Sequence, residues 1–377
     1  MKGDEFIMCS DFLPVYKPDL SGNERAYVID CIDSSWISSN GEYIEKFEKS
    51  FAEWTGAKHA ISVCNGSVAL HLALHCLDIG PGDEVIVPTF TYIASVNTIA
   101  QTGAKPVFAE SNKSDWLIDI DKVEELITDK TRAILPVHLY GYSCDTKALR
   151  VIANKYGLKI IEDCAEAIGT KINTQHIGLT GEIGSFSFFG NKTITTGEGG
   201  MVVTNDEALA SRLRQVKGQG QSFSRRYWHE MLGFNYRMTN IEAAIGLAQM
   251  ERIDSILVRK RRIGESYKSF AAHLPVSFQN TGQHVESSYW LTTILLPENI
   301  NRDELMFYMR NAGIETRPTF YCAHTMPMYD NSESFPVAQD ISKRGLSLPS
   351  YPALTENDIL RVVETLASGL EAQHATL

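Results

Sequence analysis

The central feature of the sequence is the segment Ser185-Phe-Ser-Phe-Phe-Gly-Asn-Lys192, which Thr193-Ile-Thr-Thr-Gly197-Glu-Gly-Gly200 follows. Its aromatic, apolar character predicts a buried strand over Ser185–Phe189 that ends beside a lysine. Most lysines are solvated, but burial at the edge of an apolar strand lowers the pKa of a lysine. We therefore predict that Lys192 is a nucleophile that can form a Schiff base and carry a proton. The glycines lack the spacing of a nucleotide-binding loop and predict a tight turn.

From about residue 58, short apolar segments alternate with helical segments. The predicted strands are His59–Cys64, Glu84–Val87, Pro106–Phe108, Ala133–Val137, Lys159–Glu162, Ser185–Phe189 and Met201–Thr204. The helices predicted between them are Val68–Leu77, Ser95–Gln101 and Thr146–Tyr156. This β-α-β order predicts an α/β fold whose sheet is mostly parallel and is covered by helices on both faces.

The pattern changes near residue 250. The segments predicted from there on are a long amphipathic helix over Leu247–Tyr267, a strand over Tyr289–Leu295, and helices over Arg302–Ala312 and Glu356–Ser368. A chain of 377 residues exceeds the size of one ordinary core. We therefore expect a large domain over residues 1–250 and a smaller one over residues 251–377.

The composition argues against several classes of protein. The net charge is -11, whereas binding to nucleic acid or to a membrane surface needs clustered Lys and Arg. The seven cysteines are odd in number and form no CxxC pair, so we expect neither a disulfide framework nor a metal site. There is no run of about 18 apolar residues, and residues 1–12 lack the pattern of a signal peptide. We expect a cytoplasmic protein with reduced thiols.

Ligands of open α/β sheets bind beyond the carboxyl ends of the strands, so the residues that follow strands are candidates for a site. Asn65-Gly66-Ser67 opens a helix whose N-terminus favours a phosphate, although a plain helix cap is the more common role. The aromatic residues of Pro88–Tyr92 could cover a flat ring or belong to the core. Asp163 ends an apolar strand, where it could pair with a protonated pyridine nitrogen or cap a helix.

Polar clusters also occur in the second half of the chain. Arg225-Arg226-Tyr227-Trp228-His229 precedes Asn235-Tyr236-Arg237-Met238-Thr239. Arginines beside aromatic rings suit a nucleotide diphosphate, and a solvated loop is the alternative. Tyr321-Cys322-Ala323-His324 forms a further polar cluster, which prolines flank on both sides.

Five motifs occur in a specific order along the chain. They are Asn65-Gly-Ser, Pro88-Thr-Phe-Thr-Tyr, Glu162-Asp-Cys-Ala-Glu166, Ser185–Lys192 with Gly197-Glu-Gly-Gly, and Gly233-Phe-Asn-Tyr-Arg-Met-Thr239. Together they resemble the nucleotide-sugar aminotransferases of the DegT/DnrJ/StrS group, which are fold type I pyridoxal-phosphate (PLP) enzymes. The resemblance runs from about Leu13 to the C-terminus. It implies an aspartate-aminotransferase-like fold, with a mostly parallel, seven-stranded sheet in a large PLP domain and a smaller α+β C-terminal domain.

The resemblance also implies roles for the residues at matching positions. Lys192 would hold PLP as a Schiff base and move the proton, and Asp163 would pair with the pyridinium nitrogen. Glu166 would lie near the phenolic oxygen of the ring, at a position where many relatives have Gln or His. The further contacts implied are phosphate binding by Gly66, Ser67, Val68 and Ser187, and ring stacking by Tyr92.

A partner subunit and two substrates are implied as well. Asn235 would reach the phosphate in the neighbouring subunit, so a homodimer with its active site at the interface is expected. Arg226 would contact the nucleotide, and Tyr321 and His324 the sugar. Stretches such as Trp36-Ile-Ser-Ser and Arg226-Tyr-Trp-His resemble those family members that aminate GDP-4-keto-6-deoxymannose with L-glutamate as amino donor. The alternative is the same chemistry on a dTDP- or UDP-linked 4-keto sugar.

Three other functions are open to a chain of this kind. A PLP-dependent sugar dehydratase of the same family has histidine in place of the Schiff-base lysine, so Lys192 argues against it. A catalytically silent relative would bind PLP without consuming an amino donor, and the intact set of cofactor residues argues against that function. A nicotinamide-dependent oxidoreductase would need the phosphate fingerprint that this sequence lacks.

Overall fold

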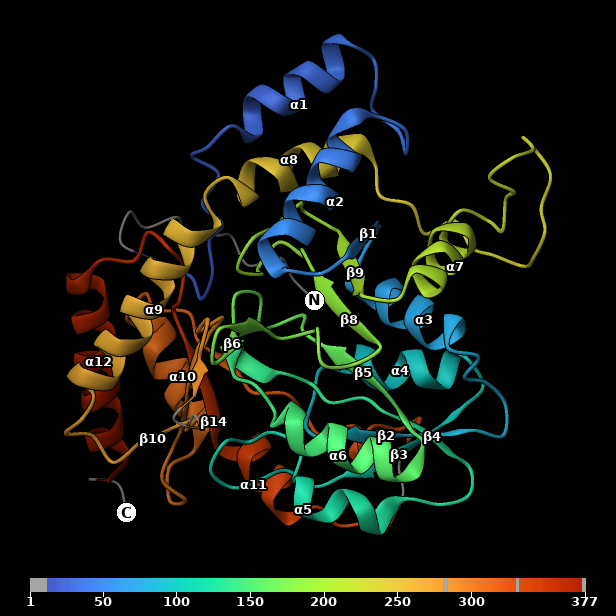
Figure 1. Cartoon of the computed structure of the whole chain (residues 1–377). Coiled ribbons are helices and arrows are strands. Elements are labelled where there is room, and N and C mark those ends of the chain that lie inside the picture. Colours follow the sequence, from blue (N-terminus) through green and yellow to red (C-terminus); the bar gives the residue numbers. More distant parts are fainter. Residues whose placement is uncertain (1–11, 281, 283, 330–331, 375–377) are drawn as a thin grey trace.

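The computed structural model describes residues 12–280, 282, 284–329 and 332–374. Most of the chain surrounds one large sheet, and a smaller body formed by C-terminal elements lies beside it (Figure 1). Residues 1–11, which hold most of the stretch where we expected no signal peptide, lie outside the described residues. Within the described ranges, no helix combines the length and the apolar character needed to cross a membrane.

The large sheet has seven strands in the order β1-β9-β8-β5-β4-β2-β3. They are β1 (His59–Val63), β2 (Glu84–Pro88), β3 (Lys105–Ala109), β4 (Thr131–Ile134), β5 (Lys159–Asp163), β8 (Ile183–Ser187) and β9 (Gly200–Thr204). Each corresponds to a predicted strand. The pairs from β8 to β3 are parallel, and β9 runs antiparallel to both of its neighbours. The prediction of a mostly parallel sheet in an α/β fold is confirmed.

The antiparallel direction of β9 follows from the short connection that precedes it. Residues 188–199 join β8 to β9 and contain Lys192. A parallel crossover usually contains a helix, whereas these twelve residues contain none and turn back. Gly197, at φ 88°, supplies a left-handed residue in that turn. The turn therefore holds Lys192 at the carboxyl end of β8.

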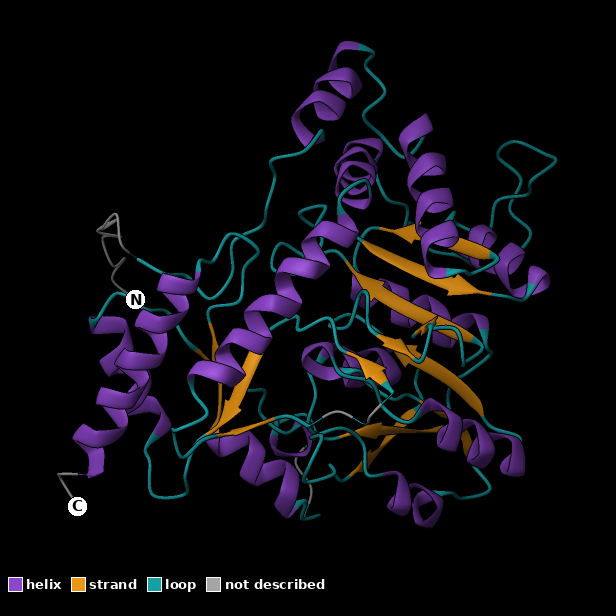
Figure 2. Cartoon of the chain, turned by 60° about the vertical axis from the view of Figure 1, so that its left-hand side comes forward, coloured by secondary structure: helices purple, strands orange, loops and turns teal. Residues whose placement is uncertain are grey.

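Helices cover both faces of the large sheet (Figure 2). The helices of the large body are α1 (Glu24–Asp33), α2 (Glu42–Thr55), α3 (Gly66–Cys76), α4 (Ala94–Gln101), α5 (Ile120–Val123), α6 (Thr146–Tyr156), α7 (Glu207–Lys217) and α8 (Asn240–Met250), and α1 packs on α8. Most residues of α3 are apolar and buried, and this helix packs against β8 and β9. The strands are buried along almost their whole length, as expected for a sheet with helices on both sides.

The smaller body has a four-stranded antiparallel sheet in the order β10-β12-β14-β13. Its elements are α9 (Ile253–Phe270), β10 (Ser277–Phe278), β12 (Thr292–Leu295), α10 (Arg302–Asn311), β13 (Arg317–Pro318), β14 (Gly345–Leu348) and α12 (Glu356–His374). A separate apolar core forms here around Tyr267, Leu305 and Val362. A small three-stranded sheet and one helix do not belong to this sheet. The small sheet has the order β11-β6-β7 (Val285–Glu286, Lys171–Ile172, Gln175–His176), and the helix is α11 (Pro336–Arg344), which packs on the core of the large sheet.

The predicted long helix over Leu247–Tyr267 is wrong in one respect, because the structure breaks it into α8 and α9. Arg252, at φ -122° and ψ 3°, leaves the helical conformation between them. Its guanidinium pairs with Asp19 at 2.8 Å. This break coincides with the predicted boundary near residue 250. The separate core of the smaller body supports the division into residues 1–250 and 251–377, which stays a proposal, since α11 packs on the large core.

The segment that precedes α1 crosses from the smaller body to the large one. Leu13 pairs with Ile314, and the Ser350 N–H donates to the Val15 carbonyl at 2.9 Å. The Tyr16 hydroxyl then donates to the carbonyl of Lys192 at 2.5 Å. This segment therefore joins residues of the C-terminal region to the turn that carries Lys192.

Candidate active site

A cavity of about 910 Å³ opens where the parallel strands end. This is the place where open α/β sheets bind ligands. Eight of the twelve predicted site residues line it, namely Gly66, Ser67, Val68, Tyr92, Asp163, Glu166, Ser187 and Lys192. The structure thus gathers every residue assigned to the cofactor except Asn235, and their contacts with it stay predictions.

One side of the cavity is the N-terminus of α3. The Asn65 side chain accepts a hydrogen bond from the Val68 N–H at 3.0 Å and caps the helix. The N–H groups of Gly66 and Ser67 lie in the first turn, where an α-helix supplies no partner. A Cβ on Gly66 would lie 2.7 Å from the Cβ of Ser187, so glycine lets the end of β8 come close. Free N–H groups beside the Ser67 hydroxyl can bind an anion. Asn65 can therefore cap the helix while the following residues bind a phosphate.

Asp163 lies at the end of β5 and is 4% exposed. The Ser95 hydroxyl donates to its Oδ2 at 2.8 Å, and the Ala165 N–H to its Oδ1 at 3.0 Å. Burial raises the pKa of Asp163, and these hydrogen bonds oppose the rise. The alternative role as a helix N-cap is wrong, because a turn and not a helix follows. The carboxylate is therefore placed to meet a cationic atom of a ligand.

Lys192 lies in the turn after β8, and its side chain is 12% exposed. Its Nζ is 3.7 Å from Oε1 of Glu166 and 4.0 Å from the centroid of the Trp290 ring. Burial lowers the pKa of Lys192, although the carboxylates of Glu166 and Asp163 oppose this. A lysine with a lowered pKa supplies the neutral amine that acts as a nucleophile and base.

Glu166 is buried beside this amine. Its Oε2 accepts a hydrogen bond from the Tyr140 N–H at 3.1 Å. Burial raises the pKa of Glu166 to about 7, against the opposing effect of the Lys192 ammonium. A carboxyl group that titrates near neutrality can hold or release a proton next to Lys192.

Three aromatic rings form a wall of the cavity that the sequence analysis missed. Tyr140 stacks on Trp290, with centroids 6.1 Å apart, and on Phe320 at 5.5 Å. Tyr140 has a positive φ of 56°, which is unusual for a residue other than glycine and is found at functional sites. Tyr140 follows a predicted strand, so the rule that selected Pro88–Tyr92 could have found it. Trp290 and Phe320 come from the distant second half of the chain and gave no such signal.

The profile of the DegT/DnrJ/EryC1/StrS aminotransferase family matches residues 18–367. The chain belongs to this family. It is 50% identical to the GDP-perosamine synthase of Vibrio cholerae over 355 residues, which cover 93% of this chain and 97% of that protein. It is also 50% identical to the GDP-perosamine synthase of Escherichia coli O157:H7 over 356 residues, covering 94% and 98%. The PMP-form of Spr1654 from Streptococcus pneumoniae superposes with a TM-score of 0.92 at 27% identity, over 97% of this chain and 99% of that one.

The family, together with solved PLP- and PMP-forms of Spr1654, indicates that this aminotransferase depends on pyridoxal phosphate. The cavity fits that group in three respects. Lys192 offers an amine for the aldehyde, Asp163 a buried carboxylate for the pyridine nitrogen, and the start of α3 an anion cradle for the phosphate. A side chain at Gly66 would clash with Ser187, so glycine keeps the start of α3 and the end of β8 together beside the cavity.

Two predicted sugar contacts lie outside the cavity of the aminotransferase. His324 is 2% exposed, and its Nδ1 lies 2.6 Å from the Thr89 hydroxyl. Its ring packs against Phe335. A ring buried in this way presents no surface to a sugar, so we do not carry His324 into the proposed site. Tyr321 is 56% exposed near the cavity, where its neighbour Phe320 forms part of the lining.

The two residues predicted to act at the nucleotide and at the neighbouring phosphate also lie outside this cavity. Arg226 and Asn235 belong to the segment that follows α7, which reaches away from the rest of the chain in Figure 1. The Arg226 guanidinium lies 4.9 Å from the ring centroid of Tyr227, on the exposed segment. Neither residue lines the cavity of its own chain, so the roles predicted for them would require a second subunit.

His138, Glu162 and Cys164 lie together in the core below the cavity. The Cys144 N–H donates to Nδ1 of His138, so the proton is on Nε2, which lies 3.2 Å from Glu162. Glu162 also accepts hydrogen bonds from the N–H groups of Gly178, Thr180 and Gly181. Hydrogen bonding satisfies the histidine and the carboxylate, so we assign them a structural role.

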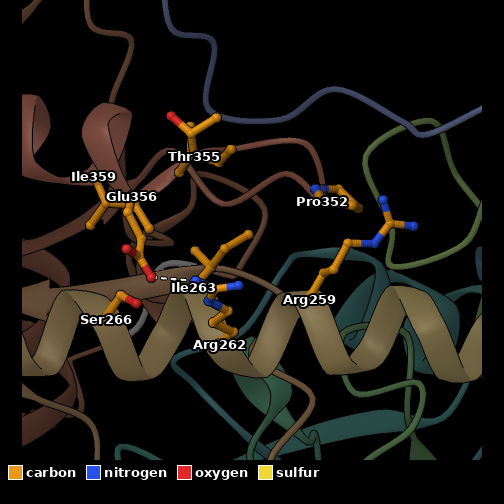
Figure 3. A pocket seen from close by; sticks show the side chains of 9 residues that line it. Arg259, Arg262, Ile263, Ser266, Pro352, Thr355, Glu356 and Ile359 are labelled. Atoms are coloured by element: carbon orange, nitrogen blue, oxygen red, sulfur yellow. Dashed lines mark hydrogen bonds and ion pairs between the residues drawn. The ribbon is translucent and has the colours of Figure 1, made fainter.

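A second cavity, of about 290 Å³, lies between α9 and the start of α12 (Figure 3). Two arginines of α9 border it. Arg259 pairs with Asp19 at 2.9 Å, and Arg262 pairs with Glu356. Because each guanidinium has a carboxylate partner, we assign no ligand to this cavity.

The raised pKa of Glu166 predicts a pH dependence of stability. The carboxyl group binds its proton up to about pH 7 in the folded protein, compared with 4.5 ordinarily. Between these values the folded state binds more protons than the unfolded state, so stability falls as the pH rises. Relative to Glu166→Gln, the free energy of unfolding of the wild-type apoprotein should fall by about 3 kcal/mol from pH 4.5 to 7.

Urea denaturation of both proteins at several pH values measures this difference. Glu265→Gln, at an exposed position of α9, serves as the control. Parallel curves for the wild type and Glu166→Gln would show that Glu166 ionises as an ordinary carboxyl group.

Proposed function

We propose that this aminotransferase transfers the amino group of L-glutamate to C4 of GDP-4-keto-6-deoxymannose, forming GDP-perosamine and 2-oxoglutarate. The observation that carries the proposal is the convergence of Lys192, Asp163 and Glu166 on one cavity. The chain is also 50% identical, over nearly its whole length, to two GDP-perosamine synthases. The product would be a precursor of O-antigen or a related polysaccharide.

Lys192 is the group that moves the proton in this proposal. When bound, PLP supplies an electron sink for the pair of electrons left on the donor's α-carbon. Lys192 would take the α-proton of the donor as a neutral amine and return it as an ammonium. Asp163 would stabilise a positive charge on the ring nitrogen of the cofactor, and Glu166 would exchange protons beside Lys192. The presence of lysine at position 192 also argues against the dehydratase alternative.

The donor requires a partner for its carboxylates, which the sequence analysis did not identify. Among the described residues that line the cavity, Lys192 and Arg317 are the only Lys or Arg side chains. Arg317 makes hydrogen bonds through Nε and Nη2 to a single oxygen of Glu315, at 3.3 Å each. Its guanidinium thus keeps donor capacity, and we assign it to a carboxylate of glutamate.

A homodimer is the arrangement that we propose for the complete site. The segment after α7 exposes large apolar side chains, with Leu232 at 90% and Tyr227 at 78% exposure. Large apolar side chains that are exposed together on one segment are typical of a surface that binds another protein. Packed on a second subunit, the segment would bring Asn235 to the phosphate and Arg226 to the nucleotide. The location in the cytoplasm that the sequence predicts stays a proposal.

The proposed function is tested in two half-reactions followed by the visible spectrum. L-glutamate should remove the band of cofactor bound to Lys192, and GDP-4-keto-6-deoxymannose should restore it. Arg317→Gln should need about tenfold more glutamate in the first step and respond to the sugar nucleotide as the wild type does. Restoration only by a dTDP- or UDP-linked 4-keto sugar would keep the chemistry and overturn the substrate. A protein that never shows the band would contradict the proposed role of Lys192.

A further inference from the structure

Lys260, in the middle of α9, is a buried cation that the proposed chemistry does not use. It is 1% exposed. Its Nζ donates to the carbonyl of Trp290 at 2.7 Å and to the carbonyl of Ser350. The same Nζ lies 5.1 Å from the ring centroid of Tyr16. None of the described carboxylates pairs with it, and burial lowers the pKa of Lys260 to about 7. A buried ammonium of this kind is costly, so a plain apolar side chain would be the easier solution for packing alone.

Trp290 and Tyr16, two residues that Lys260 contacts, both reach the turn that carries Lys192. The Trp290 ring lies 4.0 Å from Nζ of Lys192, and its Nε1 donates to the Asn191 carbonyl at 2.7 Å. The Tyr16 hydroxyl donates to the Lys192 carbonyl at 2.5 Å. Two routes therefore lead from Lys260 to Lys192, one to its amine and one to its backbone.

We infer that Lys260 is a positioning residue that holds Trp290 and Tyr16 against Lys192 and so sets the proton affinity of the nitrogen that carries the cofactor. The inference rests on the proposed role of Lys192. Among the described residues, the carbonyls of Trp290 and Ser350 have no donor other than Lys260. Without the ammonium, two buried carbonyls lose their partner, and the backbone at Trp290 must move to find another. The indole ring moves with it.

The direction in which the pKa of the nitrogen at Lys192 changes shows whether Lys260 acts through Trp290 or through its own charge. The face of the Trp290 ring stabilises the protonated form of the nitrogen at Lys192. Loss of that contact lowers the pKa of the nitrogen. Removal of the positive charge of Lys260 acting directly through space would raise it instead. Glu166 and Asp163, the charged groups that face Lys192, are unchanged in every variant.

The test is a pH titration of the visible band of the cofactor bound to the holoenzyme. In Lys260→Met we expect the midpoint to fall by about one pH unit, which is the size that a desolvated cation–π contact supports. We expect kcat to fall roughly 10- to 100-fold, as displacement of a catalytic group does. Lys260→Arg, which keeps the charge and the donors, should recover most of both losses.

Lys268 provides a matched control on the same helix. Its Nζ donates to the Tyr289 hydroxyl at 3.2 Å and lies 5.7 Å and 5.1 Å from the ring centroids of Tyr142 and Tyr289; none of these contacts is with Trp290, Tyr16 or Lys192 themselves. Lys268→Met should keep the midpoint and kcat of the wild type. In the Trp290→Leu background, Lys260→Met should add little further shift, since interacting residues are not additive.

Each outcome bears on one claim. A midpoint in Lys260→Met equal to that of Lys268→Met, or a rise in place of a fall, overturns the inference. So does a full additional shift in the Trp290→Leu background. If Lys260→Met does not fold, Lys260→Leu, which also removes both the charge and the donors, replaces it with the same expected fall, and an unchanged midpoint there is equally decisive. Absence of the band from the wild-type protein would instead contradict the proposed function.

Discussion

Replacing Lys192 by alanine should lower the rate of amino transfer by at least about 10⁴-fold. The side chain is the only amine in the cavity lining described by the structure, and it lies between Glu166 and Trp290. No neighbouring group can replace it both as the point of attachment and as the carrier of the α-proton. Single-turnover rates with L-glutamate measure the loss.

Chemical reduction gives a second measure of the same prediction. Borohydride should fix the cofactor on the peptide that contains Lys192, and mass spectrometry should find no such label in Lys192→Ala. Lys217 is an internal control, because it is also mostly buried but pairs with Glu48 at 3.1 Å outside the cavity. Label on Lys217, or amino transfer by Lys192→Ala at the wild-type rate, would refute the assignment.

Replacing Asp163 by asparagine should lower kcat by about 10²- to 10³-fold, the usual effect of removing one preorganised electrostatic group. The amide has nearly the shape of the carboxylate and can still accept the hydrogen bond from Ser95, but it cannot hold a proton on the ring nitrogen by its charge. Attachment of the cofactor to Lys192 does not depend on that charge. The variant should therefore label normally with borohydride while turning over slowly.

Ser95→Ala is the matched control for Asp163. It removes the 2.8 Å hydrogen bond to Oδ2 and leaves the carboxylate in place. We expect a loss in kcat of less than about tenfold. Equal losses in the two variants would indicate that the geometry of Asp163, and not its charge, supports the reaction.

The sequence predicted the large sheet and the cofactor side of the cavity well, because both depend on local patterns. Each strand of the large sheet is an apolar segment followed by a turn, and Asp163, Lys192 and Gly66 stand near the ends of such segments. The rule that ligands bind at strand ends then brings them together without any knowledge of distant contacts. The strand predicted to end at Phe189 ends at Ser187 in the structure, and this difference did not change the predicted position of Lys192 beyond the strand end.

The substrate side of the cavity could not be predicted in the same way. Trp290, Phe320 and Arg317 reach the cavity from the smaller body, and no local pattern records that approach. His324 stands in a polar cluster of the sequence, yet the fold turns its ring into the core. The break between α8 and α9 was likewise hidden, because Arg252 interrupts the helix while it pairs with Asp19 from the start of the chain.

The segment from Leu13 to Tyr16 bears on how the protein matures during synthesis. Its partners lie far along the chain, with 300 positions between Val15 and Glu315, whose carboxylate accepts the Val15 N–H. The ribosome synthesises the N-terminal residues first. The segment therefore cannot make these contacts until residues in the last quarter of the chain have been synthesised. The large sheet can form before that moment, but the support that Tyr16 gives to Lys192 comes only with the segment in place. The hydrogen bond from Tyr16 to the Lys192 carbonyl is thus supported by contacts that a nascent chain cannot complete before residue 315 has been synthesised.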